Sequence, residues 1–165
     1  MSANRFVRAV GLLPLLTVGG CCPPPPPPEP TEPDVAAIST VVKALYGMHG
    51  RGRIIFLGSD DGSVDSDMLA QAGTAVQEEL GVRVLPESAA DRSDFSLPAL
   101  TPKDPKTGEL GVSIQLGRFR VQGDNHLAVS AWAILSGLNA QEYEIVLKRS
   151  GDGWEIELMQ EGAVA

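Results

Sequence analysis

The clearest strand signals of this sequence lie in LAVSAWAILSGLNAQEYEIVLKRSGDGWEIEL, residues 127–158. Its opening run, 127–135, is almost wholly apolar and predicts a long strand. Apolar residues then occupy every second position in two further segments: Tyr143, Ile145 and Leu147, and after them Trp154, Ile156 and Leu158. Such alternation predicts strands with one apolar face. Between these two strands, Ser150-Gly151-Asp152-Gly153 predicts a tight hairpin turn.

A fourth strand is predicted just before this stretch. Val112, Ile114 and Leu116 alternate with polar neighbours, and the turn-forming residues 122–125 follow. Four strands joined by short turns form an antiparallel meander, and here one face is apolar over the last two strands. Other elements must pack on that apolar face to bury it.

Two helices are available as the cover. Asp34 is placed to cap a helix with apolar residues at helical spacing, and Gly47 is a candidate stop. A second helix is expected over 66–80, ended by Gly81. Short strands are expected at 54–57 and 82–85, and a long loop over 86–110. The predicted class is α+β: two helices packed on a mainly antiparallel sheet with a C-terminal four-stranded meander.

The N-terminus has the layout of a secretory signal peptide. Arg5 and Arg8 precede an uncharged, mostly apolar run of 12 residues, 9–20. That run is too short to span a bilayer as a helix, which needs about 20 apolar residues. It ends in Val18-Gly19-Gly20-Cys21, which resembles the lipobox of bacterial lipoproteins.

The lipobox resemblance implies that Cys21 receives a diacylglyceryl group and becomes the new N-terminus after residues 1–20 are cleaved. Two or more acyl chains hold a protein stably at a membrane. The alternative is a plain signal peptide with a chance cysteine. Cys22 stands where the family's inner-membrane retention signal usually has Asp, which favours the outer membrane in a host with two membranes. The expected location is the cell envelope, outside the cytoplasm.

Residues 23–33, PPPPPPEPTEP, predict a stiff polyproline stalk. Eleven residues in this conformation extend about 34 Å. We interpret residues 21–33 as a lipidated cysteine and spacer, and residues 34–165 as one α+β domain. A proline-rich ligand for an aromatic-lined groove is the alternative role for this segment.

Composition excludes some functions. The 165-residue chain has 13 basic and 21 acidic residues, a formal charge of -8, which argues against a nucleic-acid-binding surface. Loss of Arg5 and Arg8 with the leader leaves 11 basic residues against 21 acidic ones, a formal charge of -10. Both cysteines lie near the N-terminus, which excludes a disulfide framework within the domain.

The meander, with its Gly153-Trp154 hairpin, is similar to the sheets of small NTF2-like and cystatin-like α+β modules. It also looks like an uncharacterised domain of bacterial lipoproteins that ends in a Trp strand. The resemblance covers roughly residues 110–160. It implies a fold and carries over no catalytic residue.

One dense set of possible metal ligands is present: Asp60, Asp61, Asp65 and Asp67. Clustered carboxylates suit hard cations such as calcium. The alternative is structural, with Asp60 and Asp61 in a turn and with Asp65 and Asp67 at the start of the second helix. His49, in a Gly-rich link, and His126, at a turn, are expected to be exposed or at an edge.

A ligand pocket, if the domain has one, is expected to involve Trp132, Tyr143 and Trp154. Trp154 is also expected in the core beside Ile156 and Leu158. The leading hypothesis is a non-enzymatic binding or interaction module without a cofactor, held off the membrane by its stalk, whose partner is an envelope protein or a small ligand. The alternatives are a membrane-anchored, metal-dependent hydrolase that uses the acidic loop 60–67, and a structural envelope component.

Overall fold

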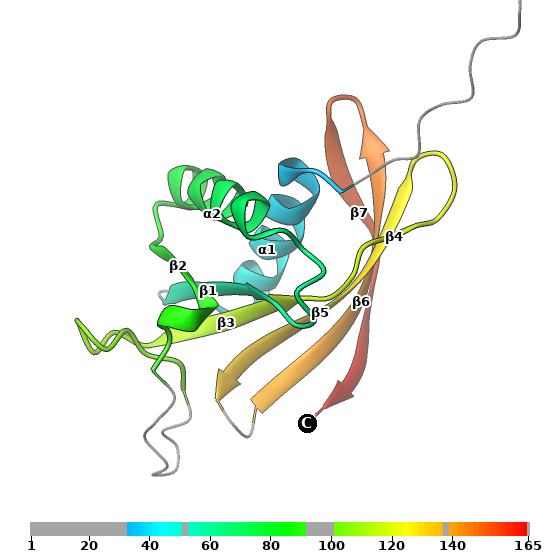
Figure 1. Cartoon of the computed structure of the whole chain (residues 1–165). Helices are drawn as coiled ribbons and strands as arrows, with labels where there is room; N and C mark the ends of the chain where they lie inside the picture. The colour runs from blue at the N-terminus through cyan, green and yellow to red at the C-terminus, as the bar shows by residue number, and fades with distance from the viewer. Residues whose placement is uncertain (1–32, 51–52, 92–100, 137–138, 165) are drawn as a thin grey trace, which may run out of the picture.

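The computed structural model describes residues 33–50, 53–91, 101–136 and 139–164, with side chains to 162. It has two helices and a mixed, mostly antiparallel sheet, so the α+β prediction is confirmed. Both helices lie on the same side of the sheet (Figure 1). We call the side that they cover the core face and the other side the far face.

The sheet has seven strands in the order β2-β1-β3-β5-β6-β7, with β4 paired to β5. The strands are β1 (Ile54–Ser59), β2 (Val84–Pro86), β3 (Gly111–Leu116), β4 (Arg120–Val121), β5 (His126–Ser136), β6 (Asn139–Ser150) and β7 (Gly153–Val164). Strands β3, β5, β6 and β7 pair antiparallel in succession and form the C-terminal meander. Strand β1 pairs in parallel with both β2 and β3, which the sequence pattern did not predict.

Helix α1 (Val35–His49) begins where its cap predicts. The Asp34 carboxylate accepts a hydrogen bond from the Ala37 backbone N–H at 2.8 Å. The expected stop at Gly47 is wrong, because the helix continues to His49 and ends at Gly50. Since a single glycine costs a helix only about 1 kcal/mol, the packed residues before it can carry the helix past that position.

Helix α2 (Ser66–Leu80) has the predicted bounds. Asp65 caps it by accepting from the backbone N–H groups of Asp67 and Met68, and Gly81 ends it in the left-handed conformation. A short 3-10 helix, η1 (Glu87–Ala89), follows β2. The strand expected at 82–85 therefore lies at 84–86, and the expected loop 86–110 begins with the end of β2 and η1.

The core lies between the helices and the core face of the sheet. Helix α1 contributes fully buried Ile38, Val41, Val42 and Leu45, and the meander contributes Leu127, Val129, Ile145 and Leu147. At about 25 cal/mol per Å² of apolar surface, such side chains each contribute roughly 1.5–3 kcal/mol. Apolar burial against the meander is therefore what holds α1 in place.

A β-bulge changes the predicted face of Leu158. Leu147 pairs with Ile156 but Val146 pairs with Leu158, so β7 has one extra residue, Glu157, at this point. Leu158 therefore faces the far side and is 45% exposed, and the prediction that it shares the core face with Ile156 is wrong. Met159, which packs on the core, takes its place.

Candidate functional site

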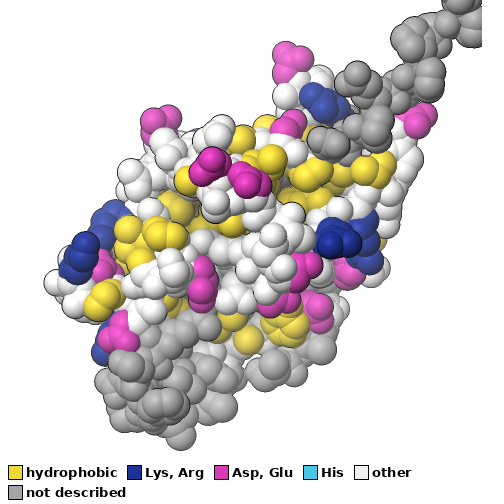
Figure 2. Space-filling view, viewed as in Figure 1, with side chains coloured by type: hydrophobic (Ala, Val, Ile, Leu, Met, Phe, Trp, Pro, Cys, Tyr) yellow, Lys and Arg dark blue, Asp and Glu magenta, His cyan; other side chains and the backbone are white. Residues whose placement is uncertain are grey.

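A groove between α2 and the edge strand β2 is the most distinct hollow of the described structure. Its volume is about 280 Å³. Ten residues line it: Leu57, Ser66, Leu69, Ala70, Gly73, Thr74, Gln77, Val84, Leu85 and Pro86. Figure 2 shows hydrophobic side chains at the surface below α2, on the side where Figure 1 places β2. Most of the lining is apolar, as in small-molecule sites.

Small residues on α2 keep this groove open. Leu57 of β1 is 4% exposed, whereas Ala70 and Thr74 on the helix are exposed to solvent. A Cβ atom on Gly73 would lie only 3.1 Å from Val84 Cγ1, so glycine lets the helix approach β2 closely at this point. Larger side chains at these positions would fill the groove.

The outer edge of β2 is poorly suited to pairing with another strand. The Val84 backbone N–H donates to Gln77 Oε1 at 3.2 Å. Pro86 has no backbone N–H, and the strand is only three residues long. Short, proline-containing and capped edges are the features by which proteins avoid strand addition. The groove is therefore better suited to a ligand that enters by its own apolar surface than to an extended peptide.

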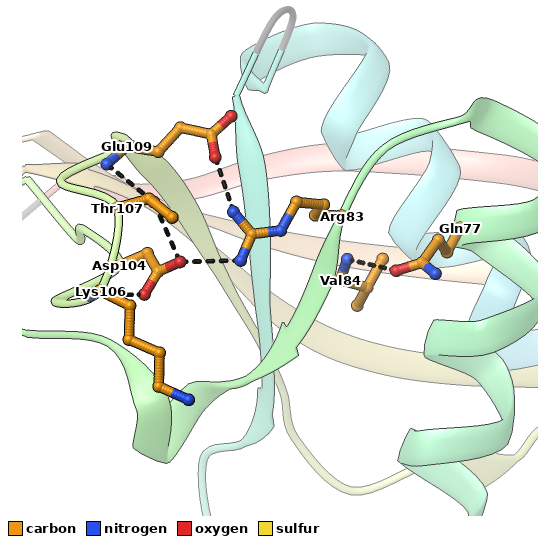
Figure 3. Close-up of polar contacts among 7 residues, drawn as sticks. All are labelled: Gln77, Arg83, Val84, Asp104, Lys106, Thr107 and Glu109. Carbon is orange, nitrogen blue, oxygen red and sulfur yellow. Dashed lines mark hydrogen bonds and ion pairs between the residues drawn. The ribbon is translucent and has the colours of Figure 1, made fainter.

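Among the residues that the structure describes, no ionisable side chain lines the groove. The nearby Arg83 is directed away from it, towards Asp104 and Glu109 (Figure 3). The Lys43 ammonium on α1 pairs with Glu79 of α2 at 2.8 Å. The groove therefore presents an uncharged surface in an acidic protein.

A polar cluster fixes the chain beside β2. Arg83 donates to Asp104 Oδ2 and to Glu109 Oε2, each at 2.7 Å. Asp104 is 3% exposed and also accepts from the Lys106 backbone N–H and the Thr107 hydroxyl. The cluster joins the 104–109 turn to Arg83, the residue that precedes β2. The turn lies within the segment 86–110, for which the sequence pattern predicted only a loop.

The hydrogen bond from Arg83, together with that from the Lys106 backbone, holds the pKa of Asp104 below its usual value. The carboxylate is therefore harder to protonate in the folded than in the unfolded state. The stabilisation that it provides is complete above the ordinary aspartate pKa of about 4. It is lost as the pH falls through the lowered pKa of the folded protein.

Replacing Asp104 with Asn should lower Tm at pH 7 by about 3 °C or more, because it removes the charge that faces Arg83. The difference from the unaltered protein should narrow as the pH falls below the ordinary aspartate pKa of about 4 and through the lowered pKa of Asp104. Thermal melting across this pH range measures both effects. Asp152→Asn, in the exposed β6–β7 turn, is the control and should have little effect. A Tm difference that shows no narrowing at acid pH would refute this role of the Arg83–Asp104 pair.

The four aspartates proposed as metal ligands are placed as local turn and cap residues. Asp61 accepts from the Ser63 backbone N–H at 2.9 Å, and hydrogen bonds from the Ser63 side chain and backbone lower the pKa of Asp61. Asp65 caps α2, and Asp67 lies in the first turn of that helix. Within the described ranges, no three His, Cys, Asp or Glu side chains form a group able to hold a metal ion. Asp60, Asp61, Asp65 and Asp67 are thus not brought together as a ligand set.

The two histidines lie apart. His49 is the last residue of α1, not part of a linker as expected, and it is half-buried rather than fully exposed. Its Nε2 lies 2.6 Å from the hydroxyl of Tyr143. Burial of Tyr143, and then the charge of Glu161, raise the pKa of that hydroxyl. His126 begins β5 and lies 3.2 Å from Glu157.

The three aromatic residues proposed for a pocket do not share one face of the sheet. Tyr143 pairs with Ala131 on the core face, so the neighbouring Trp132 faces the far side. Trp154 is 7% exposed and belongs to the core, as predicted. Its indole N–H donates to Asp34 Oδ1 at 3.0 Å. A single pocket lined by Trp132, Tyr143 and Trp154 is therefore not formed.

A second, smaller hollow of about 160 Å³ lies where the chain enters the domain. Pro33, Asp65, Arg118 and Phe119 are among the residues that line it. This hollow is smaller and carries charges of both signs, so we consider the α2–β2 groove the better candidate. Cys21 lies outside the described residues. None of the helices in the described ranges is long and apolar enough to cross a membrane.

A scan of the chain against protein-family models gave no match, and searches of curated proteins and of solved structures found no similar protein. A proposal for its function has to come from its own residues.

Proposed function

We propose that this protein is a lipid-anchored binding module of the cell envelope, whose α2–β2 groove binds a small apolar ligand. The anchor is Cys21 and the spacer is the proline-rich segment 23–33. The observation that carries the binding role is the open groove of about 280 Å³ with its largely apolar lining. A ligand that covers the apolar surface of such a groove removes this surface from water, and this lowers the free energy of the bound state.

A binding role fits the groove better than a catalytic one. None of its described lining residues has a titratable side chain that could serve as a general acid or base. The Thr74 hydroxyl already donates to the Ala70 carbonyl at 3.0 Å. The described lining of the groove can therefore contact a ligand, but it contains no pair of a nucleophile and a base.

The anchor supports a binding role at the membrane. With a formal charge of -10 after cleavage, the protein is repelled by anionic head groups, so the acyl chains must hold it there. The proline-rich sequence 23–33 predicts a spacer that extends about 34 Å. At that distance, a groove that takes up apolar molecules stays open to the aqueous space.

Filling the groove should weaken ligand binding. Ala70→Phe places a large ring over the lining from an exposed helix position, and we expect the Kd for 2-acetylnaphthalene to rise about tenfold or more. The measurement is fluorescence titration of the full chain in lipid nanodiscs, corrected with empty discs for partition into lipid. Gln71→Phe adds the same ring to an exposed α2 residue outside the groove and should leave the Kd unchanged. Equal affinity in both variants, or no binding by the unaltered protein, would contradict the proposal.

A further inference from the structure

We propose that Gln77 recognises the ligand through its side-chain amide N–H groups, so that the ligand is a small uncharged molecule with an apolar body and one hydrogen-bond acceptor. A ketone or ester carbonyl is the simplest such acceptor. This inference rests on the proposed function and specifies the chemistry of the molecule that the groove takes.

The orientation of Gln77 is fixed by its partner. A backbone N–H can only donate, so the amide must present its oxygen to Val84, and the two atoms lie 3.2 Å apart. The amide nitrogen is then left on the side away from Val84 (Figure 3). Within the described residues this nitrogen donates to no protein group, so its two N–H groups are available to a ligand in the groove that Gln77 lines.

The other polar groups of the lining are less suited to this role. The Thr74 hydroxyl is bonded to the Ala70 carbonyl. Ser66 is at the start of α2, 11 residues before Gln77, which is about 16 Å along a helix. A ligand that packs between α2 and Val84 therefore meets Gln77 as its nearest free donor.

Charge and size restrict the ligand further. A carboxylate in this groove would lose water without gaining a cation, because none of the described lining residues is Lys, Arg or His. An apolar cavity of about 150 Å³ holds one benzene ring. The volume of about 280 Å³ thus fits a molecule of about two rings. The closed edge of β2 disfavours an added peptide strand as the occupant.

Three naphthalenes that differ at one substituent test this chemistry. 2-Acetylnaphthalene carries the acceptor, 2-isopropylnaphthalene has nearly the same shape without it, and 2-naphthoate carries a charge. With the full chain in nanodiscs, and affinities corrected for partition into lipid, we expect the ketone to bind about three- to tenfold more tightly than the hydrocarbon. The carboxylate should bind at least about tenfold more weakly than the ketone.

Gln77→Glu is the informative variant. It keeps an oxygen to accept from the Val84 N–H and removes the N–H donors, so the edge of β2 stays capped. The preference for the ketone over the hydrocarbon should disappear. The infrared carbonyl band of bound, 13C-labelled 2-acetylnaphthalene should move to lower frequency in the unaltered protein and not in Gln77→Glu. Thermal melting checks that the variant is folded.

The outcomes separate the two proposals. If ketone and hydrocarbon bind equally and both are displaced by Ala70→Phe, the groove binds ligands but Gln77 does not recognise an acceptor, and this inference is overturned. The same holds if Gln77→Glu keeps the ketone preference. If no probe binds, the proposed function fails and the inference fails with it.

Discussion

Replacing Trp154 with Ala should lower the free energy of unfolding by about 3–5 kcal/mol. Trp154 is 7% exposed, and its indole N–H donates to Asp34 Oδ1, the same atom that accepts from the Ala37 N–H at the start of α1. The Arg149 guanidinium also lies 5.5 Å from the centre of the indole ring. The variant would lose core packing and the contact between β7 and the helix cap together. Because domains are stable by only about 5–15 kcal/mol, the loss would be large.

Urea unfolding followed by circular dichroism measures this loss, and two variants serve as comparisons. Trp154→Phe keeps an aromatic ring in the core but removes the N–H donor, so we expect a loss of about 1–2 kcal/mol. Trp132→Ala removes the other tryptophan, which is half-buried on the far face, and should cost clearly less than Trp154→Ala. If both alanine variants lost the same stability, the assignment of Trp154 as the main link between meander and helix would be wrong.

Replacing Cys21 with Ser should abolish acylation and release the protein from the membrane or leave it unprocessed. The nucleophile of a cysteine is its thiolate, and serine has no thiol group to form one. Without acyl chains, a chain with a formal charge of -10 has no attraction to an anionic bilayer. Metabolic labelling with an alkyne fatty acid, followed by membrane fractionation, measures both effects in intact cells.

Cys22→Ser is the matched control for this experiment, since it removes the adjacent thiol and leaves Val18-Gly19-Gly20-Cys21 intact. The control protein should incorporate label and stay with the membrane. Labelled, membrane-bound Cys21→Ser protein would show that Cys21 is not the lipidated residue.

The elements that sequence alone predicted well are those set by local signals. Asp34 and Asp65 carry the oxygen that a helix start needs, and both helices begin immediately after them. The β6–β7 turn is set by Gly151, which has a φ of +60° at the first central position, as a type II′ turn requires. Apolar alternation also placed the meander correctly.

The missed features depend on contacts between distant residues. Nothing local in β7 signals the extra residue at Glu157 that turns Leu158 outwards, because the bulge is a matter of register with β6. The parallel pairing of β1 with β2 and β3 likewise depends on contacts between strands that are distant in the sequence. The resemblance to NTF2-like and cystatin-like modules stays a prediction.

The α2–β2 groove also could not be predicted from the sequence pattern. Its walls come from β1, α2 and β2, and the close approach of α2 to β2 depends on Gly73, whose place opposite Val84 follows only from the tertiary packing. Aromatic rings often line pockets, but Trp132 and Tyr143 lie on opposite faces of the sheet because Tyr143 pairs with Ala131, and alternation within either strand does not give this register. A glycine within an amphipathic helix was the available signal for close packing at this place.

The most direct test of the binding role is a methyl-labelled NMR titration of the full chain in nanodiscs with 2-acetylnaphthalene. We expect intermolecular contacts between the probe and the methyl groups of Leu69, Val84 and Leu85, and none to Leu127 or Leu147, which are fully buried in the core. Probe contacts that fall on the far face, or saturating probe that leaves the three groove methyl signals unchanged, would contradict the assignment of the α2–β2 groove as the binding site.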